Sequence, residues 1–406
     1  MRGRRIAWAL GVCACSAATP PAVPDPPPDP PRTELTVWHS YRGDERLAFL
    51  ATVSAYDATR PDLDVVLVAV PHDALPDKLG VAIPRGNGPD VFVFAHDRVG
   101  DWAQRSYLEP LGFLTDAALA GRFYDETLSP LVYRGDLYGL PLAFKCLALY
   151  YDRTLVTEPA RTTDALIAQT TALRARDRAV WGLGYEVDSL YFHQPFLDGF
   201  GGALYSDERD TLAFDSNEAA ASLDFVRGLL VDHKVIPNEA TSALVSSLFL
   251  KHSLAYVVSG PWFRAELAGH EGWGVAPLPI VSATGRPSRP FLGVEGLMLN
   301  RYSKHKTAAF ELMTALTTDD AAFVRSQTGG QLVANRQVYL RSEVRDDPFA
   351  QVFRAQLGHS VALSNRPHMR RMWTPLKDAL SRAIVHGEDP AAALRLARTR
   401  VEEGAP

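Results

Sequence analysis

The chain has 406 residues, of which 47% are hydrophobic and 22% charged, a composition typical of a globular protein large enough for two lobes. Forty-seven acidic residues against 42 basic ones give a formal net charge of −5. This balance lacks the one-sided basic field that phosphate contacts require, so nucleic acid is not an expected partner.

The first fifteen residues have the layout of an export signal. Three arginines precede an apolar run, Ile6 to Val12, that is too short to span a bilayer as a helix. Val12-Cys13-Ala14-Cys15 resembles a bacterial lipobox, in which a signal peptidase cuts before a cysteine that becomes diacylated. We therefore predict a signal peptide over residues 1–14 and lipidation of Cys15, with Cys13 disfavoured because bulky Val12 precedes it. The alternative is a plain secretory signal with incidental cysteines.

Residues 15–32 are predicted to carry this lipid and to form an extended tether. The stretch TPPAVPDPPPDPPR, from Thr19 to Arg32, is too rich in proline to pair into a sheet or hold a helix. Cleavage before Cys15 leaves 39 basic and 47 acidic residues, a formal charge of −8, and only Cys146 besides the anchor. No disulfide framework is therefore expected, and the core must supply the stability.

The segment after the tether alternates between strand and helix patterns. Strands are predicted at Leu35–Trp38, Asp64–Val70 and Pro89–Phe94, with helices at Asp44–Thr59 and Asp73–Ile83. This order favours a parallel sheet covered by helices on both faces, in which ligands bind beyond the carboxyl ends of the strands. Topology alone places two sets of polar residues at that edge: Ser40, Tyr41 and Arg42, then Asp97 and Arg98.

A second group of elements begins with the apolar run Cys146–Tyr151, which we interpret as the first crossover between two lobes. Gly293–Leu299 is predicted to be a strand that returns to the first lobe, and the tail from Asp347 is helical in pattern. No apolar run reaches the length of a transmembrane helix. The remaining predicted elements are helices at Thr163–Arg176, Asn217–Asp232, Ser242–Lys251 and Lys304–Thr317, a helix opened by Gly260-Pro261-Trp262, and strands at Leu254–Val258 and Trp273–Val275.

Four segments carry a resemblance to the maltose-binding proteins, the family 1 extracellular solute-binding proteins of ABC sugar importers. Their order and spacing cover nearly the whole chain after the tether, from Leu35 to Glu402. They are Gly86 to Arg98 (GNGPDVFVFAHDR), Ser259-Gly260-Pro261-Trp262, Arg286 to Val294 (RPSRPFLGV), and Pro367-His368-Met369 followed by Trp373.

The resemblance implies the α/β periplasmic-binding-protein type II fold, in which two α/β lobes are joined by a multi-crossing hinge. We predict an N-terminal lobe of residues 33–143 plus 295–330 and a C-terminal lobe of residues 144–294 plus 331–406. It also implies closure on a sugar or oligosaccharide, which is handed to an ABC permease in the membrane. We expect a monomer without cofactor, exported to the periplasmic or cell-surface face and anchored through Cys15.

Several residues match the family's contacts to sugar by position. The matching residues are Asp97, Arg98, Tyr191, Phe192, Trp262 and Trp373. Two acidic ligand residues of the family are replaced here by Lys145 and Ser189, a tryptophan by Phe94, and a late arginine by Lys377. Phe94, Lys145 and Lys377 are retained as candidate ligand residues, and these departures leave the identity of the sugar open.

The chemistry of a sugar accounts for these residue types. A sugar ring presents an apolar face and a rim of hydroxyls, so its site needs aromatic plates together with charged donors and acceptors. Each residue also has a structural alternative. The tryptophans, Tyr191 and Phe192 fit a role in packing, Asp97 and Arg98 fit a local ion pair, and Lys145 fits a solvated charge.

Other chemistry finds little support in the sequence. The glycine clusters do not match a dinucleotide or P-loop spacing, and the histidines lack the helical pairing of a metal site, so no metal is predicted. A glycosidase would need paired carboxylates, for which Glu186, Asp188, Glu295 and Asp97 are candidates without a distinguishing spacing. A sugar-sensing lipoprotein that signals to a receptor remains a further alternative.

Overall fold

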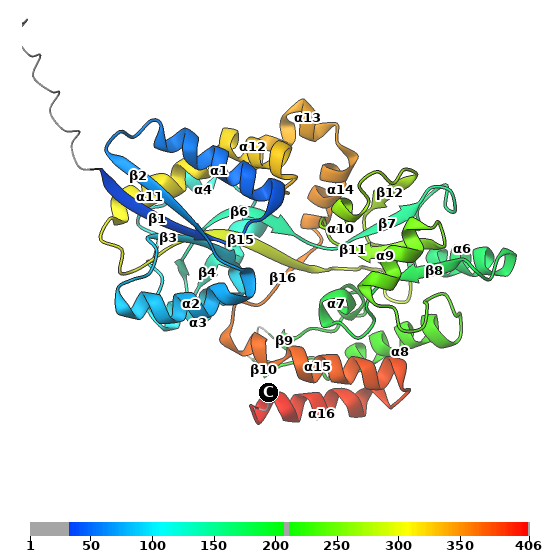
Figure 1. Cartoon of the computed structure of the whole chain (residues 1–406). Helices are drawn as coiled ribbons and strands as arrows, with labels where there is room; N and C mark the ends of the chain where they lie inside the picture. Colours follow the sequence, from blue (N-terminus) through cyan, green and yellow to red (C-terminus); the bar gives the residue numbers. More distant parts are fainter. Residues whose placement is uncertain (1–31, 207–210, 405–406) are drawn as a thin grey trace, which may run out of the picture.

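The computed structural model describes residues 32–206 and 211–404, and the predicted signal peptide, Cys13, Cys15 and nearly all of the tether lie outside these ranges. Two α/β units lie side by side, each built around its own sheet, and the long strand β15 (Phe291–Leu299) runs from one unit toward the other (Figure 1). Among the described residues, no helix is long and apolar enough to cross a bilayer.

The first sheet is mixed. β1 (Thr33–His39) lies between β2 (Leu63–Ala69) and β3 (Val91–Ala95), and all three are parallel, as the sequence predicted. β15 joins β3 antiparallel, while β6 (Leu140–Lys145) and the short β16 (Val361–Ala362) both pair with β15. The parallel order therefore places the ends of β1 and β3 at the same edge of the sheet.

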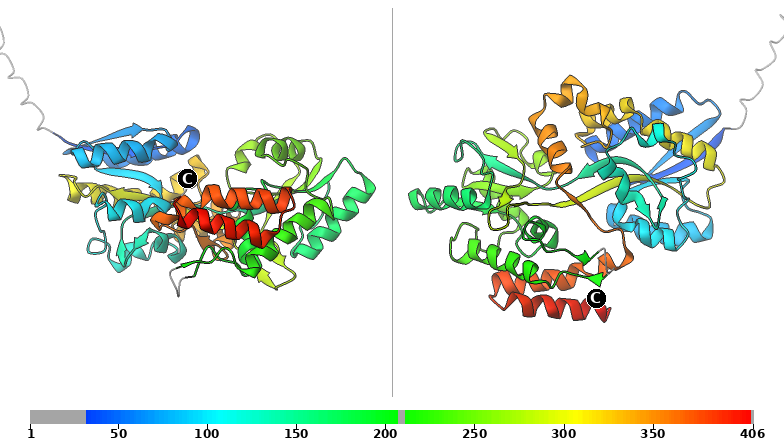
Figure 2. Two further views of the ribbon diagram at one scale, coloured as in Figure 1. Left: turned by 90° about the horizontal axis from the view of Figure 1, so that it is seen from below. Right: turned by 180° about the vertical axis from the view of Figure 1, so that it is seen from behind.

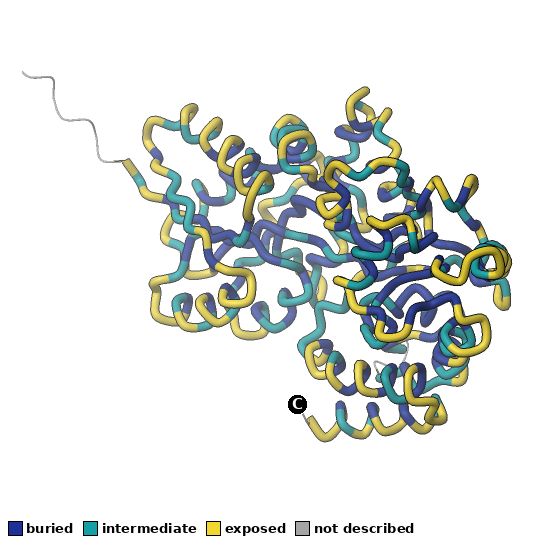
Figure 3. Tube along the Cα trace, turned by 45° about the vertical axis from the view of Figure 1, so that its right-hand side comes forward, coloured by how far each residue is buried: buried dark blue, intermediate teal, exposed yellow. Residues whose placement is uncertain are grey.

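Helices cover both faces of this sheet. α1 (Gly43–Asp57) packs against α11 (Lys306–Leu316) and α12 (Asp319–Gly329) on one face, and α2 (Leu75–Ala82) and α3 (Val99–Gln104) lie on the other (Figure 1). Strand alternation explains the two core layers, because Leu35 and Val37 point into one and Trp38 into the other. In both units, the β-strands are buried and the outer sides of the helices are exposed (Figure 3).

The second sheet has the order β12 (Trp273–Ala276), β7 (Ala148–Asp152), β11 (Leu254–Ser259), β8 (Trp181–Gly184). Two elements of this unit were not predicted from the sequence: the strand β8 and the helix α7 (Leu190–Gly199). Gly182 and Gly184 weaken a strand pattern, and Pro195 inside α7 breaks a helix pattern. The helices around this sheet also include α6 (Thr163–Arg176), α8 (Asn217–Val231), α9 (Ser242–Leu250), α10 (Phe263–Glu266), α14 (Pro348–Leu357), α15 (Trp373–Leu380) and α16 (Pro390–Glu402).

Short elements complete the chain. They are α4 (Ala117–Ala120), α5 (Asp125–Leu128), α13 (Ser342–Arg345), β4 (Val132–Tyr133), β5 (Asp136–Leu137), β9 (Tyr205–Ser206), β10 (Thr211–Leu212), β13 (Ile280–Val281), β14 (Arg286–Pro287), seven 3₁₀ or π turns among the described residues, and the loops that join them.

The segment from Val361 to Arg366 ties the two units together. It lies between α14 and α15, which belong to the second unit, yet Asn365 donates to the carbonyls of Pro130 and Val132 at 2.9 and 2.8 Å and accepts from the Gly100 amide. The same orange segment descends between the units in the rear view (Figure 2). The predicted C-terminal lobe thus contains a segment bonded to the first unit, and the lobe boundaries themselves stay predictions.

Candidate functional site

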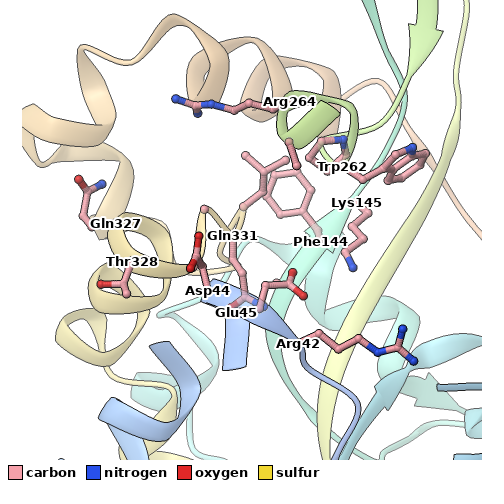
Figure 4. Close-up of a pocket in the computed structure, with 16 residues that line it drawn as sticks. Arg42, Asp44, Glu45, Phe144, Lys145, Trp262, Arg264, Gln327, Thr328 and Gln331 are labelled. Carbon is pink, nitrogen blue, oxygen red and sulfur yellow. The ribbon is translucent and has the colours of Figure 1, made fainter. Parts of the chain in front are cut away.

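A cavity of about 580 Å³ lies between the two units. One wall comes from the first unit, at the start of α1, the end of β6 and the loop after α12, and the other from the second unit around α10 (Figure 4). Its charged and polar lining residues are Arg42, Asp44, Glu45, Lys145, Arg264, Gln327, Thr328 and Gln331. The cavity is therefore bounded by both units and offers hydrogen-bond donors and acceptors of both signs.

Trp262 supplies the aromatic surface of this cavity. Its side chain is 40% exposed, which is unusual for tryptophan and leaves part of the indole uncovered. The ring folds back over Gly260, where an added Cβ would lie 2.1 Å from an indole carbon. The glycine of Ser259-Gly260-Pro261-Trp262 is thus required by the close approach of the indole to the backbone.

We expect Gly260→Ala to displace the Trp262 indole and to weaken ligand binding without unfolding the protein. The new methyl group occupies the position of the ring, so the side chain must leave it. Gly80→Ala is the matched control, because nothing lies within 4 Å of a Cβ there. Indole fluorescence and a binding titration measure the effect, and unchanged values for both variants would contradict this position of the indole.

Beneath the cavity, Lys145 is held by a partly buried carboxylate. Lys145 Nζ lies 2.7 Å from Glu295 Oε1, and the Tyr41 hydroxyl donates to Glu295 Oε2 at 3.1 Å. Burial opposes ionisation of Glu295, but Lys145 and the tyrosine hydrogen bond outweigh it, so the pKa of Glu295 is lowered. The Glu295 charge in turn raises the pKa of Lys145, and the site holds a fixed ion pair.

Further polar groups surround this pair. Burial and the negative charge of Glu295 raise the pKa of Glu45, a residue that lines the cavity. Arg325 is fully buried beneath Tyr41, and burial lowers the pKa of its guanidinium to about 10. Two of its nitrogens have no hydrogen-bond partner among the described residues. This floor is therefore a polar network with unused hydrogen-bonding capacity.

Four aromatic rings form a row on the second unit. The ring centroids of Trp262 and Tyr191 are 6.1 Å apart, and those of Tyr191 and Phe291 are also 6.1 Å apart. The ring centroids of Phe291 and Trp373 are 6.3 Å apart. Phe291 is buried, whereas the two tryptophans at the ends of the row keep exposed surface. The row brings the two predicted tryptophan plates into one assembly, although Trp373 does not line the 580 Å³ cavity.

The loop after β3 is organised by His96. Its Nδ1 accepts from the Val294 amide at 2.9 Å, so Nε2 donates to the Leu363 carbonyl at 2.6 Å. Burial lowers the pKa of His96, which is consistent with this neutral tautomer. Burial also raises the pKa of Asp97, whose carboxylate is 3.9 Å from Arg98 Nε. His96 thus fastens the predicted ligand loop to β15 and to the segment that ties the units.

The structure separates the predicted site residues into groups. Arg42, Lys145 and Trp262 line the 580 Å³ cavity, and Phe192 shares a small cavity of about 30 Å³ with Trp262. Tyr41 lies in the floor. Asp97 and Arg98 occupy the loop after β3, and Arg98 lines a different cavity with Arg370. The predicted set is therefore spread over several places rather than gathered around the one cavity.

Three predicted residues have less direct roles in this conformation. Phe94 is 5% exposed, and His72 stacks on its ring at 4.8 Å, so the outer aromatic face at this position belongs to His72. Ser40 Oγ lies 3.4 Å from His72 Nδ1. Lys377 is 64% exposed and pairs with Asp188 at 3.6 Å.

Glu45, Arg264, Gln331 and His72 were not predicted as site residues. The positions of Glu45, Arg264 and Gln331 depend on the folding of α1, α10 and the loop after α12 into one cavity, which no local pattern records. Glu295 was considered only as a possible catalytic carboxylate. One signal was available for it, since an acidic residue within the apolar strand FLGVEGLML requires a buried partner.

Two α/β units joined by several chain crossings, with a polar and aromatic cavity between them, define a two-lobe binding protein. Residues 42–323 match the model of the bacterial extracellular solute-binding protein family. The chain belongs to this family.

Curated relatives and solved structures agree with this assignment. The chain is 27% identical over 360 residues to a maltotriose-binding protein of Pyrococcus abyssi, covering 86% of this chain and 77% of the relative. It is 23% identical to a maltooligosaccharide ABC transporter solute-binding lipoprotein of Streptococcus pneumoniae, over 80% of this chain and 79% of the relative.

Among solved structures, a cyclo/maltodextrin-binding protein complexed with maltotetraose has a TM-score of 0.85 and 26% identity, covering 93% of this chain and 98% of the other. A Staphylococcus aureus extracellular solute-binding protein in complex with maltose has a TM-score of 0.81 and 25% identity, with 92% and 98% covered. The expected type II fold and the resemblance to maltose-binding proteins are confirmed, and these relatives are binding proteins.

Proposed function

We propose that this protein is the substrate-binding lipoprotein of an ABC importer and captures a sugar or oligosaccharide of the maltose class between its two units. The exposed Trp262 indole carries the proposal, because it lines a cavity that combines apolar surface with charged and polar groups and whose walls come from both units. A ligand in that cavity touches both units at once, so its binding favours the closed arrangement. The sugars named for the relatives agree with this chemistry.

The proposal includes the context of the chain. Cys15 carries the lipid anchor, with Cys13 as the alternative, residues 15–32 form the tether, and the folded part acts as a monomer on the periplasmic or cell-surface face. The lipoprotein relative of Streptococcus pneumoniae supports the anchor and the transport role over a sensing role. No covalent step is proposed, since the partly buried Glu295 carboxylate is occupied by Lys145 and Tyr41.

A thermal-shift screen of the purified protein tests this function. Maltose, maltotriose, maltotetraose and galactooligosaccharides are compared with amino acids and inorganic phosphate. A ligand at 100 times its dissociation constant stabilises the folded state by about 2.7 kcal/mol, so a bound saccharide raises Tm by several degrees. Failure of every saccharide would overturn the proposal. Chromatography of a bound saccharide after incubation distinguishes binding from hydrolysis.

A further inference from the structure

Asp152, His252 and His270 meet at one edge of the second sheet. One potential ligand atom from each lies within 4.8 Å of those of the other two. Asp152 Oδ2 is 2.7 Å from His252 Nδ1, and the two imidazole rings have centroids 4.7 Å apart. None of the three residues lines the 580 Å³ cavity, so this cluster has no part in the proposed sugar site.

The fold holds the three side chains in place. Asp152 ends β7, and His252 precedes β11 with a left-handed backbone, φ 54°. His270 lies in a turn between Gly269 and Gly272, which have φ values of 78° and 82°, so this conformation favours glycine at both positions. The Arg153 amide donates to the Gly272 carbonyl at 2.7 Å and fastens that turn to the end of β7.

An ion pair between Asp152 and His252 does not account for the whole cluster. Asp152 is fully buried, and its Oδ1 accepts from the backbone amide and the hydroxyl of Thr154 at 2.7 and 2.6 Å. Asp152 Oδ2 faces His252 Nδ1. His270 Nε2 is buried and has no hydrogen-bond partner among the described residues. A buried ring nitrogen without a partner is costly, and a bound cation would satisfy it.

We propose that Asp152, His252 and His270 form a site for a first-row divalent cation of the Zn²⁺ type. Two imidazoles and one carboxylate are a ligand set that such cations prefer, whereas Ca²⁺ and Mg²⁺ prefer oxygen ligands. Ligand atoms about 2.1 Å from Zn²⁺ in a tetrahedral site lie about 3.4 Å apart, so the 2.7 Å contact between Asp152 and His252 must open slightly and more widely spaced ligand atoms must draw closer. The His252 side chain is 44% exposed and has room to make this adjustment.

The bound cation would join the end of β7, the start of β11 and the turn before β12. The sequence predicted no metal because the aspartate and the first histidine are 100 residues apart and match no ligand motif. The proposal departs from that expectation and does not depend on which solute the protein binds.

Zn²⁺ titration of the purified protein against a chromogenic chelator tests this site. We expect one equivalent of Zn²⁺ to bind to the wild type and affinity to fall by about tenfold or more in His270→Phe. Phenylalanine keeps a ring at this position and removes a nitrogen that bonds to nothing in the metal-free protein, so the variant should fold. His305→Ala, which removes an exposed histidine elsewhere, is the matched control.

Two further measurements make the result decisive. X-ray absorption of the Zn²⁺ complex should show imidazole nitrogens together with oxygen, and Zn²⁺ should raise Tm in the wild type and the control but not in His270→Phe. Equal Zn²⁺ affinity of the wild type and His270→Phe would overturn the site. Saccharide binding should be the same in all three proteins, so failure of this proposal is distinguishable from failure of the proposed function.

Discussion

Lys145→Met should lower the free energy of unfolding by about 1–3 kcal/mol at pH 7. Breaking a fully buried ion pair typically costs about 3–5 kcal/mol, and the loss here is smaller because the lysine side chain is 39% exposed. Methionine keeps much of the aliphatic contact, so the loss of stability comes mainly from the Glu295 carboxylate that is left without its partner. Urea unfolding of both proteins measures the difference.

The pH dependence of this variant provides a sharper test. In the wild type, the lowered pKa of Glu295 stabilises the fold above the unfolded value of 4.5 and this contribution is lost as the pH falls through the folded pKa. In the variant, burial is no longer offset by Lys145 and favours the protonated acid. The difference between the two proteins should therefore grow from pH 4 to pH 7.

Arg345→Met is the control, since Arg345 pairs with Asp346 at 2.8 Å, with both side chains at least 60% exposed, away from the cavity. A surface pair of this kind contributes little to stability. Equal losses for the two variants, with equal pH profiles, would contradict the partly buried ion pair at the floor of the cavity.

Trp262→Ala should weaken saccharide binding by about 1–2 kcal/mol, or roughly 5- to 30-fold in Kd. The loss follows from removal of an exposed aromatic face at the cavity between the units. Calorimetric titration with the saccharide found in the thermal screen measures it. Phe113→Ala, which removes a fully exposed aromatic ring outside the cavity, should bind like the wild type. Wild-type affinity of Trp262→Ala would exclude the indole as a sugar contact.

From the sequence, Trp373 was expected to contact the sugar, as Trp262 was. The structure places Trp373 at the far end of the aromatic row, against Phe291, and outside the lining of the cavity. A ligand that contacts both tryptophans must therefore extend along the row, as an oligosaccharide does. The ratio of the losses in Trp262→Ala and Trp373→Ala across saccharides of increasing length would measure that extension.

The sequence predicted the strongly periodic elements well. The helix expected over Asp44–Thr59 spans Gly43–Asp57, and the strand expected over Leu254–Val258 spans Leu254–Ser259. The pattern of apolar residues is informative there, because α1 buries one face against the core and β11 is a continuous apolar run that is buried throughout. It fails for α7, where Pro195 lies inside a helix stabilised by tertiary packing, and for β8, where glycines make room for neighbouring side chains such as Thr170.

The site was less predictable than the fold. Trp262, Lys145 and Arg42 were recognised from motif or topology, yet the partner that fixes Lys145 comes from residue 295. Pairing between β6 and β15 brings these residues together, with Lys145 opposite Gly293 and Ala143 opposite Glu295. Such a register follows from the whole sheet and not from local sequence, so the residue types were predictable while their partners were not.

The crossing between β6 and β7 makes Cys146 a natural reporter of motion. Its thiol is fully buried at this crossing and is the only cysteine in residues 32–206 and 211–404. Burial raises its pKa to about 12, and only the thiolate reacts readily as the nucleophile toward alkylating reagents. Modification therefore requires a transient exposure of the crossing. The rate of thiol alkylation, measured with and without bound solute, would then give, without any added label, the rate at which the protein opens.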